Sequence, residues 1–121
     1  MKQIYRFNVY LVFLLLLLSS CNKRQDVAVG DLELVGTWYF KNSNKTIEIN
    51  MESNGMGYTN SKVGITTEEY KGKFRIIDEQ IVFKVLGKEK IHKIEKRPYT
   101  GKLNGIDRTL MDIDGEVFYK K

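Results

Sequence analysis

The stretch YKGKFRII, residues 70–77, alternates between apolar or small residues and basic ones through its first six positions. A period of two is that of a β-strand, whose successive side chains point to opposite faces. The pattern therefore predicts a strand with one face on a core and the other in water. The inward set is Tyr70, Gly72, Phe74 and Ile76, and the outward set is Lys71, Lys73 and Arg75.

Short runs of the same kind fill most of the chain after residue 32, and turn signals separate them. No stretch of ten residues shows a helical period. The pairs Asn54-Gly55 and Asp114-Gly115 are typical of hairpin turns. Ile91 and Ile94 are three residues apart, which breaks the alternation and predicts a bulge. The expected strands cover residues 34–41, 46–51, a ragged pair within 56–66, 70–77, 80–86, 89–96, 108–113 and 116–120.

The fold predicted from these runs is all-β, with about eight antiparallel strands joined by consecutive hairpins. A flat sheet of this kind would leave two exposed edges, and closing the sheet removes them. An up-and-down β-barrel or a strongly curved half-barrel is therefore expected, while a two-sheet sandwich stays open as an alternative. Glycines within strands are expected where the sheet bends, at Gly57, Gly64 and Gly72.

The first 20 residues have the pattern of an export signal. Lys2 and Arg6 precede an unbroken apolar block at residues 11–18, which has about half the length needed to span a bilayer. Leu18-Ser19-Ser20-Cys21 then matches the lipobox, so the N-terminus resembles that of a bacterial lipoprotein. The resemblance implies that Cys21 is lipidated and becomes the first residue of the mature chain. An ordinary secretory signal with a chance cysteine is the alternative.

Signal removal would leave 101 residues, enough for one small domain, and would reduce the formal net charge from +5 to +3 through loss of Lys2 and Arg6. Residues 21–31 are mostly polar and are interpreted as the lipidated cysteine and its tether, followed by a domain at 32–121. Nucleic acid is not an expected partner of an exported chain whose lysines are spread out. By the sorting habits of lipoproteins, Asn22 favours an outer-membrane location facing the periplasm.

The first strand of the domain opens with Gly36-Thr37-Trp38, which contains the only tryptophan. This resembles the Gly-X-Trp signature of lipocalins and fatty-acid-binding proteins. The resemblance implies that Trp38 closes one end of a barrel, that its N–H reaches a backbone carbonyl there, and that a late-strand arginine packs on its ring. Arg108 is the expected arginine. The chain contains neither the Thr-Asp-Tyr signature nor the C-terminal helix of lipocalins.

Catalytic chemistry finds little support in the sequence. His92 is the only histidine and is expected to be a surface or hydrogen-bonded residue. Cys21 would be blocked by lipid, and Glu68-Glu69 point to opposite faces of a strand. Residues 112–116, DIDGE, have too few oxygen ligands for a calcium loop and are expected to form a hairpin turn. We therefore expect no enzyme, no cofactor and no metal site.

Two kinds of non-catalytic function remain. A barrel with an open interior would bind a small hydrophobic or amphipathic ligand, whereas a solid barrel would act as an interaction or inhibitor module for an envelope protein. The irregular stretch RPYTGKLNGID, residues 97–107, is interpreted as a candidate binding loop, because loops on a rigid scaffold often contain binding residues. A hairpin with a wide turn is the alternative. Its candidate contact residues are Arg97, Tyr99 and Lys102, next to Arg108.

Overall fold

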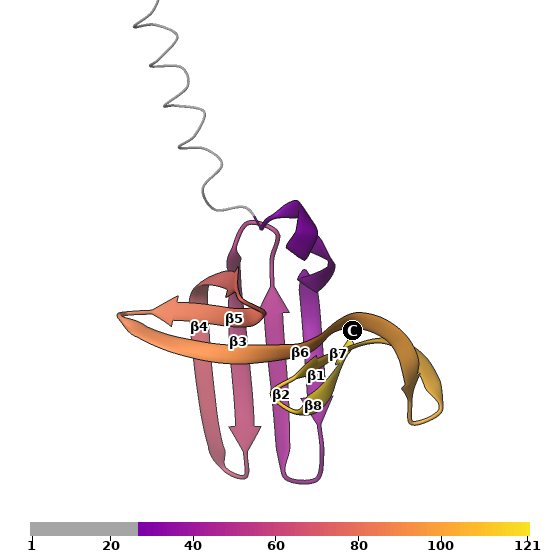
Figure 1. Cartoon of the computed structure of the whole chain (residues 1–121). Helices are drawn as coiled ribbons and strands as arrows, with labels where there is room; N and C mark the ends of the chain where they lie inside the picture. Colours follow the sequence, from indigo (N-terminus) through magenta and orange to yellow (C-terminus); the bar gives the residue numbers. More distant parts are fainter. Residues whose placement is uncertain (1–26) are drawn as a thin grey trace, which may run out of the picture.

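The computed structural model describes residues 27–121 and is all-β, as expected (Figure 1). A short 3-10 helix, η1, precedes eight strands connected by tight turns. The candidate loop expected at residues 97–107 is instead a hairpin, because β6 continues to Leu103 and β7 begins at Ile106. The elements are η1 (Val29–Leu34), β1 (Gly36–Lys41), β2 (Lys45–Met51), β3 (Met56–Val63), β4 (Thr66–Ile77), β5 (Gln80–Val85), β6 (Lys88–Leu103), β7 (Ile106–Ile113) and β8 (Glu116–Lys120).

The strands form a closed, antiparallel, up-and-down barrel in which each strand pairs with its neighbours in the sequence. The closing pair, β1 with β8, is the shortest, with Trp38 opposite Lys120 and Tyr39 opposite Tyr119. The backbone N–H of Lys121 extends this seam by donating to the Thr37 carbonyl at 3.1 Å. Closure leaves no free sheet edge, which is the physical reason for expecting a barrel rather than a sandwich.

Two long strands turn the corners of the barrel. The first part of β4 pairs with β3 and its last part pairs with β5, while β6 pairs first with β5 and then with β7. Figure 1 shows β5 and the first half of β6 running across the direction of β1 to β4. Gly57 and Gly72 are direct partners next to the β4 corner, as expected of glycines at a bend. Gly64, by contrast, lies in the β3–β4 turn.

The bulge predicted from the spacing of Ile91 and Ile94 is not found between them, and the strand pairing becomes irregular only after Ile94. Ile91 pairs regularly with Val82 and points outward, and Ile94 points inward. The pairing of β6 with β7 shifts register after Ile94 and again after Lys96. The irregular spacing of the two isoleucines therefore reflects one outward apolar residue rather than a bulge between them.

Inward-facing side chains fill the barrel. The alternation predicted for residues 70–77 is observed, since Phe74 pairs with Phe83 on the inner face and their rings lie 5.8 Å apart. Burying each such side chain contributes about 1.5–3 kcal/mol to stability. The buried cluster consists of Leu34, Trp38, Ile49, Met51, Phe74, Ile81, Phe83, Ile94, Met111, Ile113 and Phe118.

The ordered domain begins earlier than residue 32. The Val27 side chain packs against the core cluster, and its backbone N–H donates to the Ser53 carbonyl at 2.9 Å. Residues 29–34 form η1 instead of a tether and the start of a strand. The apolar Val27 and Leu34 side chains explain this difference, because Leu34 is buried in the core and Val27 packs against it while partly exposed. The predicted signal peptide and Cys21 lie outside the described residues.

Candidate functional site

A groove of about 550 Å³ lies beside the N-terminal segment. It is bounded by residues 27–31, by Gly55 in the β2–β3 turn, and by the ends of β4 and β5. The lining combines outward-facing residues of β4 and β5 with the inward-facing Phe74 and Ile76, so the groove reaches the edge of the packed core. Its lining residues are Val27, Ala28, Asp31, Gly55, Lys73, Phe74, Arg75, Ile76, Ile77, Val82 and Lys84.

Three basic side chains come together on one wall of this groove. Lys73 on β4 is directly opposite Lys84 on β5, and Arg75 is opposite Val82. Directly opposite residues on one face have their Cβ atoms about 5 Å apart, and like charges placed there repel. Within residues 27–121, none of the three forms an ion pair with a carboxylate. Glu89 is the β6 partner of Lys84 in the ladder.

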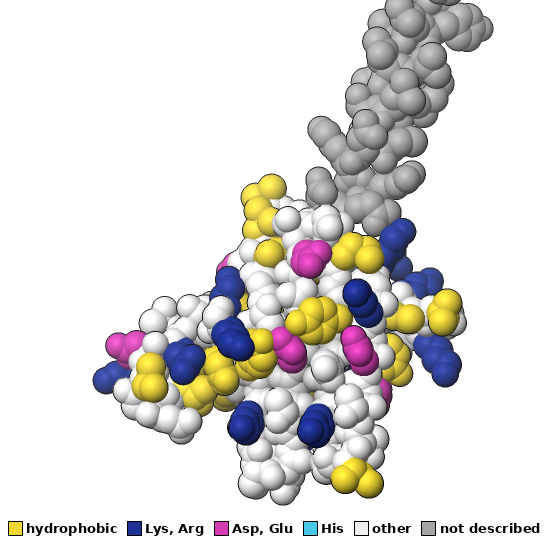
Figure 2. Space-filling model, turned by 180° about the vertical axis from the view of Figure 1, so that it is seen from behind, with side chains coloured by type: hydrophobic (Ala, Val, Ile, Leu, Met, Phe, Trp, Pro, Cys, Tyr) yellow, Lys and Arg dark blue, Asp and Glu magenta, His cyan; other side chains and the backbone are white. Residues whose placement is uncertain are grey.

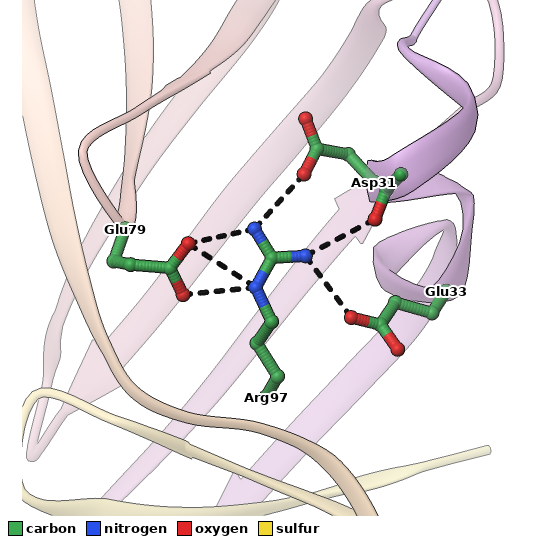
Figure 3. Close-up of polar contacts among 5 residues, drawn as sticks. Asp31, Glu33, Glu79 and Arg97 are labelled. Carbon is green, nitrogen blue, oxygen red and sulfur yellow. Dashed lines mark hydrogen bonds and ion pairs between the residues drawn. The ribbon is translucent and has the colours of Figure 1, made fainter.

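Arg97 holds the opposite wall of the groove in place (Figure 3). Its guanidinium donates to Asp31 Oδ1 at 3.0 Å, to Glu33 Oε1 at 3.0 Å and to the Gly30 carbonyl at 3.2 Å. It also donates to both carboxylate oxygens of Glu79, at 2.7 to 3.1 Å. Arg97 therefore joins η1 and the β4–β5 turn to β6 and engages Asp31, the one acidic residue in the groove lining.

Hydrogen bonding shifts the pKa values of Glu79 and Arg97. The contact with Arg97 lowers the pKa of Glu79 below its ordinary value, mainly through the hydrogen bonds and less through charge attraction. The same bonds from Glu79, Glu33 and Asp31 raise the pKa of Arg97 further above its ordinary value. Glu79 is therefore held in its ionised form, and its contribution to the cluster weakens when acid protonates it.

The substitution Arg97→Gln is expected to lower the free energy of unfolding at pH 7 by about 1–2 kcal/mol, a value reduced for solvent exposure. A carboxyl with a lowered folded-state pKa stabilises the fold above its unfolded pKa and loses that effect as the pH falls. The difference between wild type and variant should therefore shrink below about pH 4.5. Urea unfolding at pH 7 and pH 3.5 measures it, with Lys102→Gln on the same strand as control. An equal difference at both pH values would contradict the role of the ionised carboxylates.

Trp38 is buried next to η1, and Arg108, the arginine expected on its ring, does not pack on it. The indole is fully buried, and its Nε1–H donates to the Leu34 carbonyl at 2.9 Å. The cation over the indole is Lys120, with Nζ 5.7 Å from the ring. Arg108 instead lies 4.5 Å from the Tyr119 ring. Lys120 pairs directly with Trp38 across the β1–β8 seam, which explains why it takes this position.

The other candidate binding residues do not form one site. Arg97 is held in the cluster of Figure 3. Tyr99 is half-buried on the β6–β7 pair, where its hydroxyl donates to Asp112 at 2.7 Å and Lys96 Nζ lies 4.1 Å from its ring. The hydrogen bond to Asp112 raises the Tyr99 pKa. Lys102 is exposed near the β6–β7 turn. Because β6 is extended, these residues are spread along the strand and do not converge.

His92 is a hydrogen-bonded core residue, the second of the two environments expected for it. A 2.7 Å bond joins its Nδ1 to Asp114, and its Nε2 lies 3.4 Å from the Thr59 hydroxyl. The order threonine, histidine, aspartate resembles a hydrolase triad in outline. Thr59, however, is only 2% exposed, so its hydroxyl cannot reach a substrate. The three residues instead connect β3, β6 and the β7–β8 turn.

Residues 27–121 contain no group of three or more side chains arranged to hold a metal ion. In the same part of the chain, no helix has the length and apolar character needed to cross a bilayer. The described residues thus form a small up-and-down barrel with a groove on its surface. No protein-family model, curated protein or solved structure matches this chain.

The basic groove wall was not identified from the sequence as a candidate site, although Lys73 and Arg75 lie in residues 70–77, the stretch with the clearest alternation. Lys73 and Arg75 are interpreted there as the water-facing side of a strand. The structure places the segment at residues 27–31 beside that side and makes it a wall. The one available signal was Val82, an apolar residue at an outward position of β5.

Proposed function

We propose that this chain is a lipid-anchored protein of the bacterial envelope, in the outer membrane facing the periplasm. The lipobox at Leu18 to Cys21 supports the anchor. The described domain starts at Val27, six residues after Cys21, and each residue spans at most about 3.6 Å. The barrel would therefore sit within about 20 Å of its acylated cysteine. Two or three acyl chains hold a protein firmly to a bilayer.

The domain, in this proposal, is a lipocalin-like module that binds a small amphipathic molecule. The observation that carries it is the groove of about 550 Å³, which combines apolar walls with three basic side chains. Pockets for small molecules generally have volumes of about 300–1,000 Å³ with a few polar groups among apolar ones. The position of Trp38 and its bond to Leu34 also support the likeness. Because aromatic side chains fill the interior, the ligand binds in the groove and not inside the barrel.

An interaction module is the second candidate. The filled interior favours it, since a solid barrel needs no cavity to bind a protein. Two apolar side chains are also fully exposed at hairpin tips, Ile65 between β3 and β4 and Leu86 between β5 and β6. In Figure 1 the β3–β4 turn lies at the bottom of the barrel and the β5–β6 turn projects to the left, so the two tips do not form one continuous patch. The groove therefore supports ligand binding more strongly than the hairpin tips support a protein-interaction surface.

The substitution Cys21→Ser should release the protein from the membrane, because serine has no thiol to accept the lipid. Fractionation of cells that express wild type and variant measures the change. We expect the wild type in the membrane pellet and most of the variant in the soluble fraction. Ser20→Ala keeps a small residue before the cysteine and is the matched control. A Cys21→Ser variant that still sediments with membranes would refute the anchor.

Native mass spectrometry tests the binding function. The chain from residue 21 onward, with Cys21→Ser, contains the complete closed barrel and its core and can fold without the preceding residues. We expect one small molecule per chain after gentle purification. Ala28→Trp should displace this molecule, because Ala28 is an exposed lining residue. Val29→Trp, next to it but outside the lining, is the control. A domain that stays empty after incubation with envelope lipid extracts would favour the interaction module.

A further inference from the structure

We propose that the groove ligand is a single-chain amphiphile with an anionic head group, a carboxylate or a phosphate, held by Lys73, Arg75 and Lys84. This inference rests on the proposed binding function of the groove. It assigns the head group to the basic wall formed by β4 and β5. The apolar chain then lies along Val82, Ile77 and Val27, which line the rest of the groove.

The arrangement of the basic side chains is the first reason. Lys73 and Lys84 are direct cross-strand partners, and Arg75 follows Lys73 by two residues on the same face. Such a group of like charges is unfavourable in the empty protein. An anion placed between them removes the repulsion and gains charge-assisted hydrogen bonds. Glu89 is the one carboxylate opposite Lys84 in the ladder, and it forms no ion pair with Lys84 within the described residues.

The apolar side of the groove is the second reason. Val82 points outward from β5 and is still only 9% exposed, which shows that the groove walls already shield it from water. Ile77, at the end of β4, is 43% exposed and leaves apolar surface to cover. An apolar chain covering it would gain about 25 cal/mol for each Å² removed from water. A purely polar anion would leave this surface uncovered.

The surrounding charges indicate a free amphiphile and not the surface of an anionic membrane. Exposed acidic residues flank the groove, with Glu52 in the β2–β3 turn and Asp78 and Glu79 in the β4–β5 turn. Figure 2 shows Asp and Glu side chains interspersed with Lys and Arg over one face of the molecule, with no broad basic surface. A flat anionic bilayer would meet these carboxylates, whereas one small head group could lie against the basic wall. Asp31, the one acidic residue of the lining, is paired with Arg97.

Isothermal titration with decanoate, below its micelle concentration, tests the inference on the soluble chain from residue 21. We expect one binding site, with affinity at least about tenfold higher than for the uncharged 1-decanol and falling as salt is added. The double substitution Lys73→Gln/Lys84→Gln should weaken decanoate binding by about tenfold and leave 1-decanol binding unchanged. The matched control is Lys62→Gln/Lys102→Gln, which removes the same charge outside the groove lining.

The outcomes distinguish a failure of this inference from a failure of the proposed binding function of the groove. Equal affinity for decanoate and 1-decanol, both abolished by Ala28→Trp, would overturn the anionic head group and leave groove binding intact. Binding of neither ligand, in a chain that also co-purifies with no small molecule, would overturn both. Sedimentation with phosphatidylglycerol vesicles that depends on Lys73 and Lys84, without decanoate binding, would replace the free amphiphile by a membrane surface.

Discussion

Replacement of Trp38 by alanine is expected to lower the free energy of unfolding by about 3–5 kcal/mol. The indole is fully buried at the end of the barrel and belongs to the core cluster. Its removal leaves a cavity between β1, η1 and the β8 seam and also frees the Leu34 carbonyl. A domain of this size has a total stability of about 5–15 kcal/mol, so the variant should be close to unfolding. Urea unfolding followed by circular dichroism measures the loss, since the variant has no tryptophan left to report by fluorescence.

The companion variant Trp38→Phe separates packing from hydrogen bonding. Phenylalanine keeps most of the apolar contacts but cannot donate to the Leu34 carbonyl. We expect a smaller loss, about 1–3 kcal/mol, from the unpaired carbonyl and the reduced volume. If Trp38→Ala cost less than about 1 kcal/mol, the indole would not be a principal core residue.

The second large effect is expected for Gly57→Ala in β3. A Cβ atom at this position would lie 2.1 Å from the Asn50 carbonyl oxygen of the neighbouring strand. The clash is with backbone, so β2 and β3 must separate or shift. Overpacking of this kind typically costs about 1–3 kcal/mol, and the rigid partner places Gly57→Ala at or above the upper end. Thermal and urea unfolding of the purified variant measure the change.

Gly30→Ala provides the matched control for Gly57→Ala. No atom lies within 4 Å of a Cβ built at Gly30, which stands in the exposed η1 segment. This variant should stay within about 0.5 kcal/mol of wild type, as expected for a surface substitution without contacts. A Gly57→Ala protein as stable as the Gly30→Ala protein would show that β2 and β3 can adjust without cost.

Local patterns were enough to predict most of the fold. Residues 70–77 alternate as a strand does, and Phe74 is buried while Lys73 and Arg75 are exposed. The turn at Asp114-Gly115 was predictable because an Asp-Gly pair favours hairpin turns that need positive φ at both residues. The observed φ angles are 53° and 77°. Residues 97–107 were mispredicted because a proline and two glycine positions are typical of loops. β6 accommodates Pro98 at the register shift between Lys96 and Tyr99, where the proline needs no partner in β7, and pairing resumes from Tyr99 to Leu103.

The sequence likewise predicted only part of the contacts made by the candidate site residues. The sequence identified Trp38 and its bond to a carbonyl, since a buried indole N–H must have a partner. It could not identify the cation over the ring, because Lys120 reaches Trp38 only through the seam that closes the barrel. Arg97 was a candidate for binding, but three carboxylates from two distant segments surround it.

The sequence by itself determined the strands, their turns, the inward-facing residues and the motif at Cys21, because each of these follows from short-range spacing along the chain. The tertiary structure alone decided that the outward face at Lys73, Arg75 and Lys84 is one wall of a groove. Alternation states which side of a strand faces the core. Which segment covers the other side depends on contacts between residues far apart in the chain, such as Arg97 with Asp31, and these leave no periodic signal in the sequence.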